Sequence, residues 1–236
     1  MNILILGASS SIGQAIIEKL SFDNNLFLLK SNKEKIKKNI NNSLLNKNEI
    51  KIIEADLSNK INPEIVINYN INIFINAACA TSSLRNYEIN PSLIKSHLLV
   101  DLENPLILLE NILNKEKNRK DFKLNYILIN TIVSKIQSPD NSIYYSFKIL
   151  QQEYVRAIEL KNKGKLKFTN VIIGTQINRN KITKKAIKLA DRIKTAIVKN
   201  KSEIIFGFEG KLIYYIYNIS PIISNILIYL KRIISK

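Results

Sequence analysis

The sequence predicts an α/β fold in which a doubly wound parallel sheet carries helices on both faces, a three-layer sandwich. Two observations predict it. Short apolar runs of strand length alternate along the chain with longer segments of helical periodicity. The runs are apolar on both faces, which is typical of strands in a parallel sheet that helices cover on each side.

The individual elements follow from this alternation. We expect strands at six apolar runs, namely residues 2–7, 26–30, 50–56, 71–78, 124–131 and 167–174. We expect helices between them, namely Gln14–Leu20, a Lys-rich helix from about Lys33, a short one near 63–68, a long one from Pro91 to Lys115, and one from Ser142 to about Lys161.

The length and composition fit a single domain, residues 1–236. Of 236 residues, 46% are hydrophobic and 23% charged, which is ordinary for a soluble globular protein. No linker rich in Pro, Gly or Ser and no internal repeat divides the chain. The sequence shows no secretory signal, and the one cysteine, Cys79, suits a reducing compartment, so we expect a cytoplasmic protein.

The formal net charge of +17 raises the question of a nucleic-acid partner, because clustered Lys and Arg neutralise phosphates. The excess is nearly all Lys, and it is spread along the chain together with an abundance of Ile and Asn. This pattern favours a generally basic surface. We therefore expect no nucleic-acid partner.

A small-residue turn, "GASSSIG", follows the first apolar run. In a doubly wound sheet the pyrophosphate of a dinucleotide docks at the first strand-to-helix turn, where backbone N–H groups and the helix dipole point at it. Gly7 lies in the turn and Gly13 in the following helix, and three serines can donate hydrogen bonds. Such turns also occur without a ligand, but the position after the first strand favours a phosphate site.

Two motifs together resemble those of the short-chain dehydrogenases/reductases. The turn is similar to the family's G-x-x-x-G-x-G fingerprint, with Ser11 in place of the middle glycine. Downstream, "YYSFK" places Tyr144 and Lys148 four residues apart on one helix face, like the family's Tyr-x-x-x-Lys pair. About one such pair is expected by accident in a chain so rich in Lys, so its position in the fold carries the resemblance.

The resemblance implies roles for four residues of a catalytic centre. Tyr144 would exchange a proton with the substrate oxygen, and Lys148 would lower the pKa of that phenol and hold the cofactor ribose. Thr131, thirteen residues before Tyr144, takes the place of a serine that hydrogen-bonds the substrate carbonyl. Asp101 takes the place of an Asn; it either pairs with Lys148 or faces solvent.

Other landmarks follow in the family's order: "EADL", "INAAC" and "IGTQIN", the last two with Ala78 for Gly, Ile173 for Pro and Asn178 for Thr. The resemblance implies a Rossmann-type nicotinamide dinucleotide site that covers the chain from Asn2 to about Asn180. Its cofactor-binding residues would be Gly7, Ser9, Ser10, Ser11, Ile12, Gly13, Lys30, Ser31, Asp56, Leu57, Asn76, Ala77, Ala78, Tyr144, Lys148, Gly174 and Ile177.

The end of the second strand bears on the form of the cofactor. A site for NAD usually carries Asp or Glu there, whereas this chain has Lys30 followed by Ser31. A cation beside a short polar side chain suits a 2′-phosphate, so we expect NADP(H) to be preferred and NAD(H) to remain a second candidate. Chance placement is the competing explanation in a Lys-rich chain.

The resemblance implies an enzyme that interconverts a ketone and a secondary alcohol by hydride transfer, with no metal. A sugar, an acyl compound or a lipid-linked compound would fit as substrate, and family members are commonly dimers or tetramers. The alternative is a dinucleotide-binding sensor or scaffold that has lost catalysis. The departures at Ser11, Ala78, Asp101 and Ile173 motivate that alternative.

Three further residues have simpler explanations. Cys79 is expected to be a small packing residue, and His97 a surface or hydrogen-bonded histidine in preference to a base. Arg85 is either an exposed arginine or a contact for an anionic group of the substrate.

The tail after Gly210 is rich in apolar residues and contains no acidic one. Polar residues and Pro221 interrupt it, so a membrane-spanning helix is not expected. From Pro221 onward the apolar spacing predicts a helix with one apolar stripe. The segment 211–236 would pack on the core, on a second subunit, or on a membrane surface with Tyr214, Tyr215, Tyr217, Lys231 and Arg232 at the interface.

Overall fold

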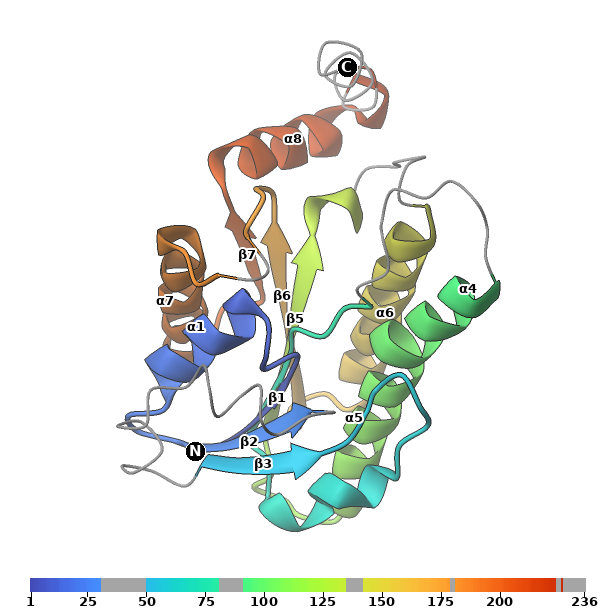
Figure 1. Ribbon diagram of the computed structural model, residues 1–236, viewed down its shortest axis with the longest axis vertical. Coiled ribbons are helices and arrows are strands. Elements are labelled where there is room, and N and C mark those ends of the chain that lie inside the picture. The colour runs from blue at the N-terminus through green and yellow to red at the C-terminus, as the bar shows by residue number, and fades with distance from the viewer. Residues whose placement is uncertain (31–49, 81–90, 135–141, 179–180, 224–225, 227–236) are drawn as a thin grey trace.

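The computed structural model describes residues 1–30, 50–80, 91–134, 142–178, 181–223 and 226 (Figure 1). Within them, a seven-stranded sheet has the order β3-β2-β1-β4-β5-β6-β7. Every neighbouring pair is parallel. The predicted doubly wound α/β fold is therefore confirmed. The helix expected from about Lys33 lies outside the described residues.

The strands are short and close to the predicted runs. They are β1 (Asn2–Leu6), β2 (Asn25–Lys30), β3 (Ile50–Glu54), β4 (Ile73–Asn76), β5 (Leu124–Thr131), β6 (Leu166–Ile173) and β7 (Glu203–Phe206). The α-helices are α1 (Ser11–Leu20), α4 (Pro91–His97), α5 (Asn104–Lys115), α6 (Ser142–Lys161), α7 (Lys184–Val198) and α8 (Phe208–Ile219). Short 3₁₀ segments lie at Pro63–Tyr69 and Ile132–Ser134.

Helices cover both faces of the sheet (Figure 1). On one face Ile3 and Ile5 pack in a cluster with apolar residues of α1 and α7. On the other face Leu4 and Leu6 pack with residues of α5 and α6. Alternate residues of β1 thus point into two separate cores, which explains why this strand is apolar from Ile3 to Leu6.

The strand order reverses at β1. Leu6 pairs with Leu29 of β2 on one side and with Asn76 of β4 on the other, and the chain leaves β1 and β4 toward opposite faces. In an open α/β sheet, ligands bind at the carboxyl ends of the strands where the order reverses. The ends of β1 and β4 therefore define the place to look for a site.

The long predicted helix from Pro91 to Lys115 is helical throughout but not uniform. A six-residue π-helical segment, Leu98–Glu103, separates α4 from α5. Such segments insert a bulge into an α-helix and rotate the side chains on either side of it.

Four elements were not predicted or have a boundary that differs from the predicted one. Helix α1 begins at Ser11 and not at Gln14, because Ser10 caps it. Helix α7 and strand β7 extend the sheet beyond the last predicted strand. Helix α8 begins before the expected tail helix, and residues 221–223 and 226 are helical after it.

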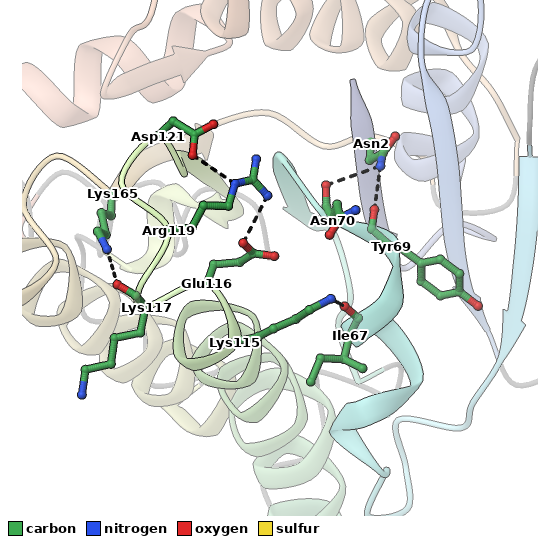
Figure 2. Close-up of polar contacts among 10 residues, drawn as sticks. All are labelled: Asn2, Ile67, Tyr69, Asn70, Lys115, Glu116, Lys117, Arg119, Asp121 and Lys165. Carbon is green, nitrogen blue, oxygen red and sulfur yellow. Dashed lines mark hydrogen bonds and ion pairs between the residues drawn. The ribbon is translucent and has the colours of Figure 1, made fainter.

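The opposite edge of the sheet, at the amino ends of the strands, is held by polar contacts (Figure 2). The Asn2 amide donates to the carbonyl oxygens of Tyr69 (2.6 Å) and Asn70 (3.4 Å). Arg119 bridges the carboxylates of Glu116 and Asp121, each at 3.2 Å. These contacts tie together the loops at this edge of the sheet.

Helix α8 lies beyond the carboxyl ends of β5, β6 and β7 (Figure 1). Ile213 and Tyr214 pack against Ile132 and Ile172, so one face of the helix contacts the body of the protein. The other face is open, with Phe208 83% and Ile219 85% exposed. Among the described helices, none has the length and apolar character needed to cross a membrane.

Candidate functional site

The turn between β1 and α1 is built so tightly that only glycine fits at two places. Gly7 has φ +74°, and a Cβ atom there would lie 2.4 Å from the carbonyl oxygen of Ala77. A Cβ atom at Gly13 would lie 2.3 Å from the carbonyl oxygen of Gly7. The first turn of α1 therefore rests directly on the ends of β1 and β4. The backbone fits the close approach of a phosphate to a helix N-terminus.

The serines of the turn serve the turn itself. The Ser10 hydroxyl accepts from the Gly13 amide at 3.0 Å and donates to the Gly7 carbonyl at 2.8 Å. The buried Ser11 hydroxyl donates to the backbone carbonyl of Asn178. The hydroxyls of Ser10 and Ser11 are thus engaged within the protein, and their role toward a cofactor stays a prediction. Exposed Ser9 and the first amides of α1, including that of half-buried Ile12, remain as donors.

Asn76 braces the end of β4. Its carboxamide oxygen accepts from the Ala78 amide at 3.1 Å, and its nitrogen donates to the Tyr126 hydroxyl at 3.0 Å. Burial raises the pKa of Tyr126 above the usual range, and the hydrogen bond from Asn76 opposes that shift. The Asn76 side chain is fully buried, so it shapes the Ala77–Ala78 turn from below.

Lys148 reaches the same turn from α6. Its ammonium nitrogen donates to the Ala78 carbonyl at 3.3 Å and lies 5.9 Å from the centre of the Tyr144 ring. The Lys148 side chain is only 1% exposed, whereas Tyr144 is half-buried. The structure thus brings the predicted Tyr-x-x-x-Lys pair to the carboxyl end of β4, beside the Gly7 contact.

Asp101 lies inside the protein, so the prediction that it faces solvent is wrong. The residue has no exposed surface, because the π-helical segment turns it toward the end of β4. One carboxylate oxygen accepts from the Ala80 amide at 3.1 Å, and the other lies 2.5 Å from Nδ1 of His97. Among the described residues its ionic partner is His97, so the predicted pairing with Lys148 is also wrong.

Thr131 ends β5 and is half-buried. Its amide donates to the side chain of Asn130 at 2.8 Å. The Asn130 amide nitrogen in turn donates to Gln152 of α6 (3.1 Å) and to Asn170 of β6 (3.2 Å). This buried network fixes the end of β5 relative to the helix that carries Tyr144.

The remaining predicted cofactor residues lie around this centre. Exposed Asp56 accepts from the Ser58 amide at 2.9 Å, and Leu57 packs on the core beyond β3. Gly174 follows β6, where a Cβ atom would lie 2.0 Å from Cα of Gly210 in α8. Ile177 packs beside the α1–α7 cluster.

Lys30, Ser31 and Arg85 lie at or beyond the ends of the described segments. Ser31 and Arg85 lie outside the described residues, and the Lys30 backbone ends β2. Cys79 is half-buried, and its thiol donates to the Ala80 carbonyl at 3.3 Å.

The contacts of two residues near the site, His97 and Gly210, were not predicted from the sequence. His97 is buried and bound to Asp101, and their i, i+4 spacing was the available signal. Gly210 is the second half of the Gly174 contact, and it is one of only six glycines in the chain. No motif marks Gly210, because the contact joins segments far apart in sequence.

A groove of about 520 Å³ lies elsewhere, lined by residues of the π-helical segment, α5 and α6, including Leu98, Leu102, Ile107 and Tyr154. None of the predicted site residues lines it. It is therefore a separate surface.

Comparisons with known proteins agree on the fold. No protein-family model and no curated protein sequence matches the chain. Among solved structures, an alcohol dehydrogenase from Comamonas testosteroni specific for bulky-bulky ketones is similar, with TM-score 0.74 and 20% identity over 86% of this chain and 85% of that one.

Two more structures show the same likeness. A short-chain dehydrogenase from Sphingobium yanoikuyae in complex with NADPH has TM-score 0.73 and 17% identity over 86% of this chain and 87% of its own. A 7beta-hydroxysteroid dehydrogenase has TM-score 0.75 and 17% identity over 92% and 91%. The chain therefore has the fold of the short-chain dehydrogenases/reductases.

Proposed function

We propose that the protein is an oxidoreductase that interconverts a ketone and a secondary alcohol with a nicotinamide dinucleotide, and that it prefers NADP(H). The observation that carries the proposal is the position of Tyr144 and Lys148 against the Gly7–Ala77 contact, at the point where the strand order reverses. Structures of this fold include alcohol and hydroxysteroid dehydrogenases, which supports the reaction class.

The residues present fit the dinucleotide. Gly7 and Gly13 leave no Cβ where the turn closes on the end of β4, and the N-terminus of α1 offers its amides and its dipole to a pyrophosphate. When bound, the nicotinamide would supply or accept the hydride. The preference for NADP(H) rests on the sequence at Lys30 and Ser31, where no acidic residue stands at the end of β2.

The chain's own part is to bind, orient and move one proton. In the direction of reduction, the Tyr144 hydroxyl gives its proton to the substrate oxygen as the carbonyl carbon receives the hydride. The Lys148 ammonium, 5.9 Å from the centre of the ring, favours the phenolate left on Tyr144. Thr131, whose hydroxyl can donate, holds the substrate oxygen in place.

A direct test compares two neighbouring tyrosines of α6. Replacing Tyr144 by Phe is expected to lower kcat by about 10² to 10⁴-fold, because the proton donor is lost. NADPH binding, followed by nicotinamide fluorescence in this Trp-free chain, should stay within about twofold. Tyr145→Phe is the matched control, since it removes a hydroxyl from the next residue on the helix and should leave kcat unchanged.

The outcomes separate the candidate functions. Turnover retained in Tyr144→Phe would contradict the proposed role of Tyr144. Tight NADPH binding with no turnover of any ketone or secondary alcohol would favour the alternative of a dinucleotide-binding sensor or scaffold. Tighter binding of NADH than of NADPH would overturn the cofactor preference alone.

We also propose that the protein is a homo-oligomer that uses the open face of α8. Phe208, Leu212, Tyr215 and Ile219 are all more than half exposed on this helix. Monomeric proteins rarely leave a contiguous apolar patch of this kind uncovered.

A further inference from the structure

The His97–Asp101 pair is buried beside the proposed catalytic centre. The two residues are 2% and 0% exposed, and Nδ1 of His97 lies 2.5 Å from a carboxylate oxygen of Asp101. Burying a carboxylate without full compensation is unfavourable, and in proteins an apolar replacement of a buried ion pair is often neutral or stabilising. Packing alone therefore does not explain why these residue types stand here.

The contacts of Asp101 indicate where the shared proton lies. Its second oxygen accepts from the Ala80 amide at 3.1 Å, the acceptor role of a carboxylate. An ionised carboxylate can only accept, so the proton in the short contact belongs to Nδ1 of His97. Asp101 thereby fixes both the tautomer and the orientation of the imidazole ring.

The fixed imidazole packs against α6. Its ring centre lies 6.3 Å from that of Tyr144, at an interplanar angle of 55°. It also lies 6.3 Å from that of Phe147, with the two rings nearly parallel at 7°. Tyr144 is therefore approached by His97 from α4 and by the ammonium group of Lys148 from its own helix.

Both neighbours of Tyr144 are anchored to the same short stretch of backbone. Lys148 donates to the carbonyl of Ala78, and Asp101, which holds His97, accepts from the amide of Ala80. A closed circuit of contacts thus runs from Tyr144 through His97, Asp101, the end of β4 and Lys148 back to Tyr144. Asp101 takes part in these contacts from its buried position in the π-helical segment.

We propose that His97 is a positioning residue of the Tyr144 site, held by Asp101 with its proton on Nδ1 so that its ring fixes the phenol of Tyr144 against the end of β4. The role in catalysis rests on the proposed function, but the geometry can be tested without it. Among the residues that the structure describes, the other charged group at this cluster is Lys148, which has its own anchor at Ala78.

The first experiment uses the full chain labelled with ¹⁵N in histidine. Because His97 is the one histidine of the sequence, its imidazole signals need no assignment. At neutral pH the two-bond ¹H–¹⁵N spectrum is expected to show the proton on Nδ1. The signals should move in Tyr144→Phe and stay in place in the control Tyr145→Phe. A neutral ring with its proton on Nε2 and none on Nδ1, or signals indifferent to Tyr144→Phe, would overturn the proposal.

The second experiment separates positioning from packing with two variants. His97→Asn keeps a donor for Asp101 but removes the ring, and His97→Phe keeps a ring but removes the donor. With NADP⁺ and a secondary alcohol as probes, both are expected to lower kcat about 10²-fold, the scale of a small misplacement, with KM for NADP⁺ within about twofold. A kcat per folded molecule equal to wild type in both variants would overturn the positioning role.

Failure of the proposed function gives a different result. If the wild-type chain turns over no alcohol or ketone, the kinetic experiment has no baseline, and the imidazole spectrum decides the geometry by itself. Tautomer and contact with Tyr144 as expected would then uphold the circuit in a protein that binds without catalysis. The opposite spectrum would overturn it irrespective of activity.

Discussion

Gly7 and Gly164 both have a left-handed backbone conformation, but only Gly7 is surrounded by close neighbouring atoms. Their φ angles are +74° and +85°, yet a Cβ atom at Gly164 would meet no heavy atom within 4 Å, whereas at Gly7 it would collide with Ala77 and Ala78. The strain of a non-glycine residue is therefore common to both positions. The steric conflict with the end of β4 belongs to Gly7 alone.

This pair gives a clean prediction at the residue scale. Gly164→Ala should lower the free energy of unfolding by about 1–2 kcal/mol, the cost of a left-handed alanine. Gly7→Ala should lower it by more and weaken NADPH binding, because the first turn of α1 must move away from β4. Urea unfolding and nicotinamide fluorescence measure the two effects. Equal loss of stability in both variants would contradict the close contact at Gly7.

Tyr126 provides a prediction about pH. Burial, opposed in part by the hydrogen bond from Asn76, raises the pKa of Tyr126 in the folded protein. The neutral phenol therefore stabilises the fold below the usual tyrosine pKa of about 10, and this contribution falls as pH rises above that value, where the unfolded chain ionises first.

The variant Tyr126→Phe should flatten this alkaline loss. At pH 8 it should be less stable by about 1–3 kcal/mol, because Asn76 and Gln151 lose their acceptor. Between pH 9.5 and 11 its stability should fall less steeply than that of the wild type, as measured by urea unfolding. An unchanged slope would show that Tyr126 is accessible to ionisation in the fold.

At the residue scale, the sequence predicts which residues lie at the site better than it predicts which partners they contact. The places of Gly7, Asn76, Tyr144 and Lys148 follow from strand ends and helix spacing, which are local properties. The partners of Asp101 depend on a π-helical rotation and on Ala80, twenty-one residues away, and no local pattern specifies either.

At the scale of elements, α8 is seated on β6 through a pair of glycines. Cα of Gly210 approaches Gly174 so closely that a Cβ atom on Gly174 would lie 2.0 Å from it. Inside a helix, Gly→Ala normally stabilises by up to about 1 kcal/mol. At this contact the added methyl group would instead push the helix off the sheet.

Gly210→Ala should therefore destabilise the protein although it improves helix propensity. We expect weaker protection of the α8 amides in hydrogen exchange, with the protection of α7 retained. Lys211→Ala, at the next and exposed position of α8, should leave both unchanged. An unaltered α8 in Gly210→Ala would refute the close packing.

The elements themselves were predicted where their apolar pattern is strong. Strand β1 from Ile3 to Leu6 and strand β5 from Tyr126 to Ile129 are continuous apolar runs because helices cover both of their faces. The four-residue strand β7, whose residues alternate between half-buried and buried, was not predicted. Helix α7 was missed although Leu189 and Ile193 carry a clear helical stripe.

At the scale of the whole molecule, the open face of α8 makes the oligomeric state testable. The double substitution Tyr215→Lys and Ile219→Lys adds two charges to that face and should dissociate the proposed oligomer, because burying them would be unfavourable. Light scattering at fixed protein concentration measures the mass. Leu160→Lys, at a position 78% exposed on α6, is the control and should not change it. A wild-type protein that is already a monomer would rule out the subunit contact.

The hydrogen bond from the Ser11 hydroxyl to the carbonyl of Asn178 joins residues 167 positions apart. The turn that opens the chain is thus completed by a segment from the last third of the sequence. The residues that follow β4 likewise make their contacts with Asp101 and Lys148, which come later in the chain. Contacts over such sequence distances form slowly, because a long loop must close first. During synthesis on the ribosome, the first residues to emerge would therefore be among the last to reach their final arrangement. Capture of a dinucleotide would then mark a chain that has finished folding.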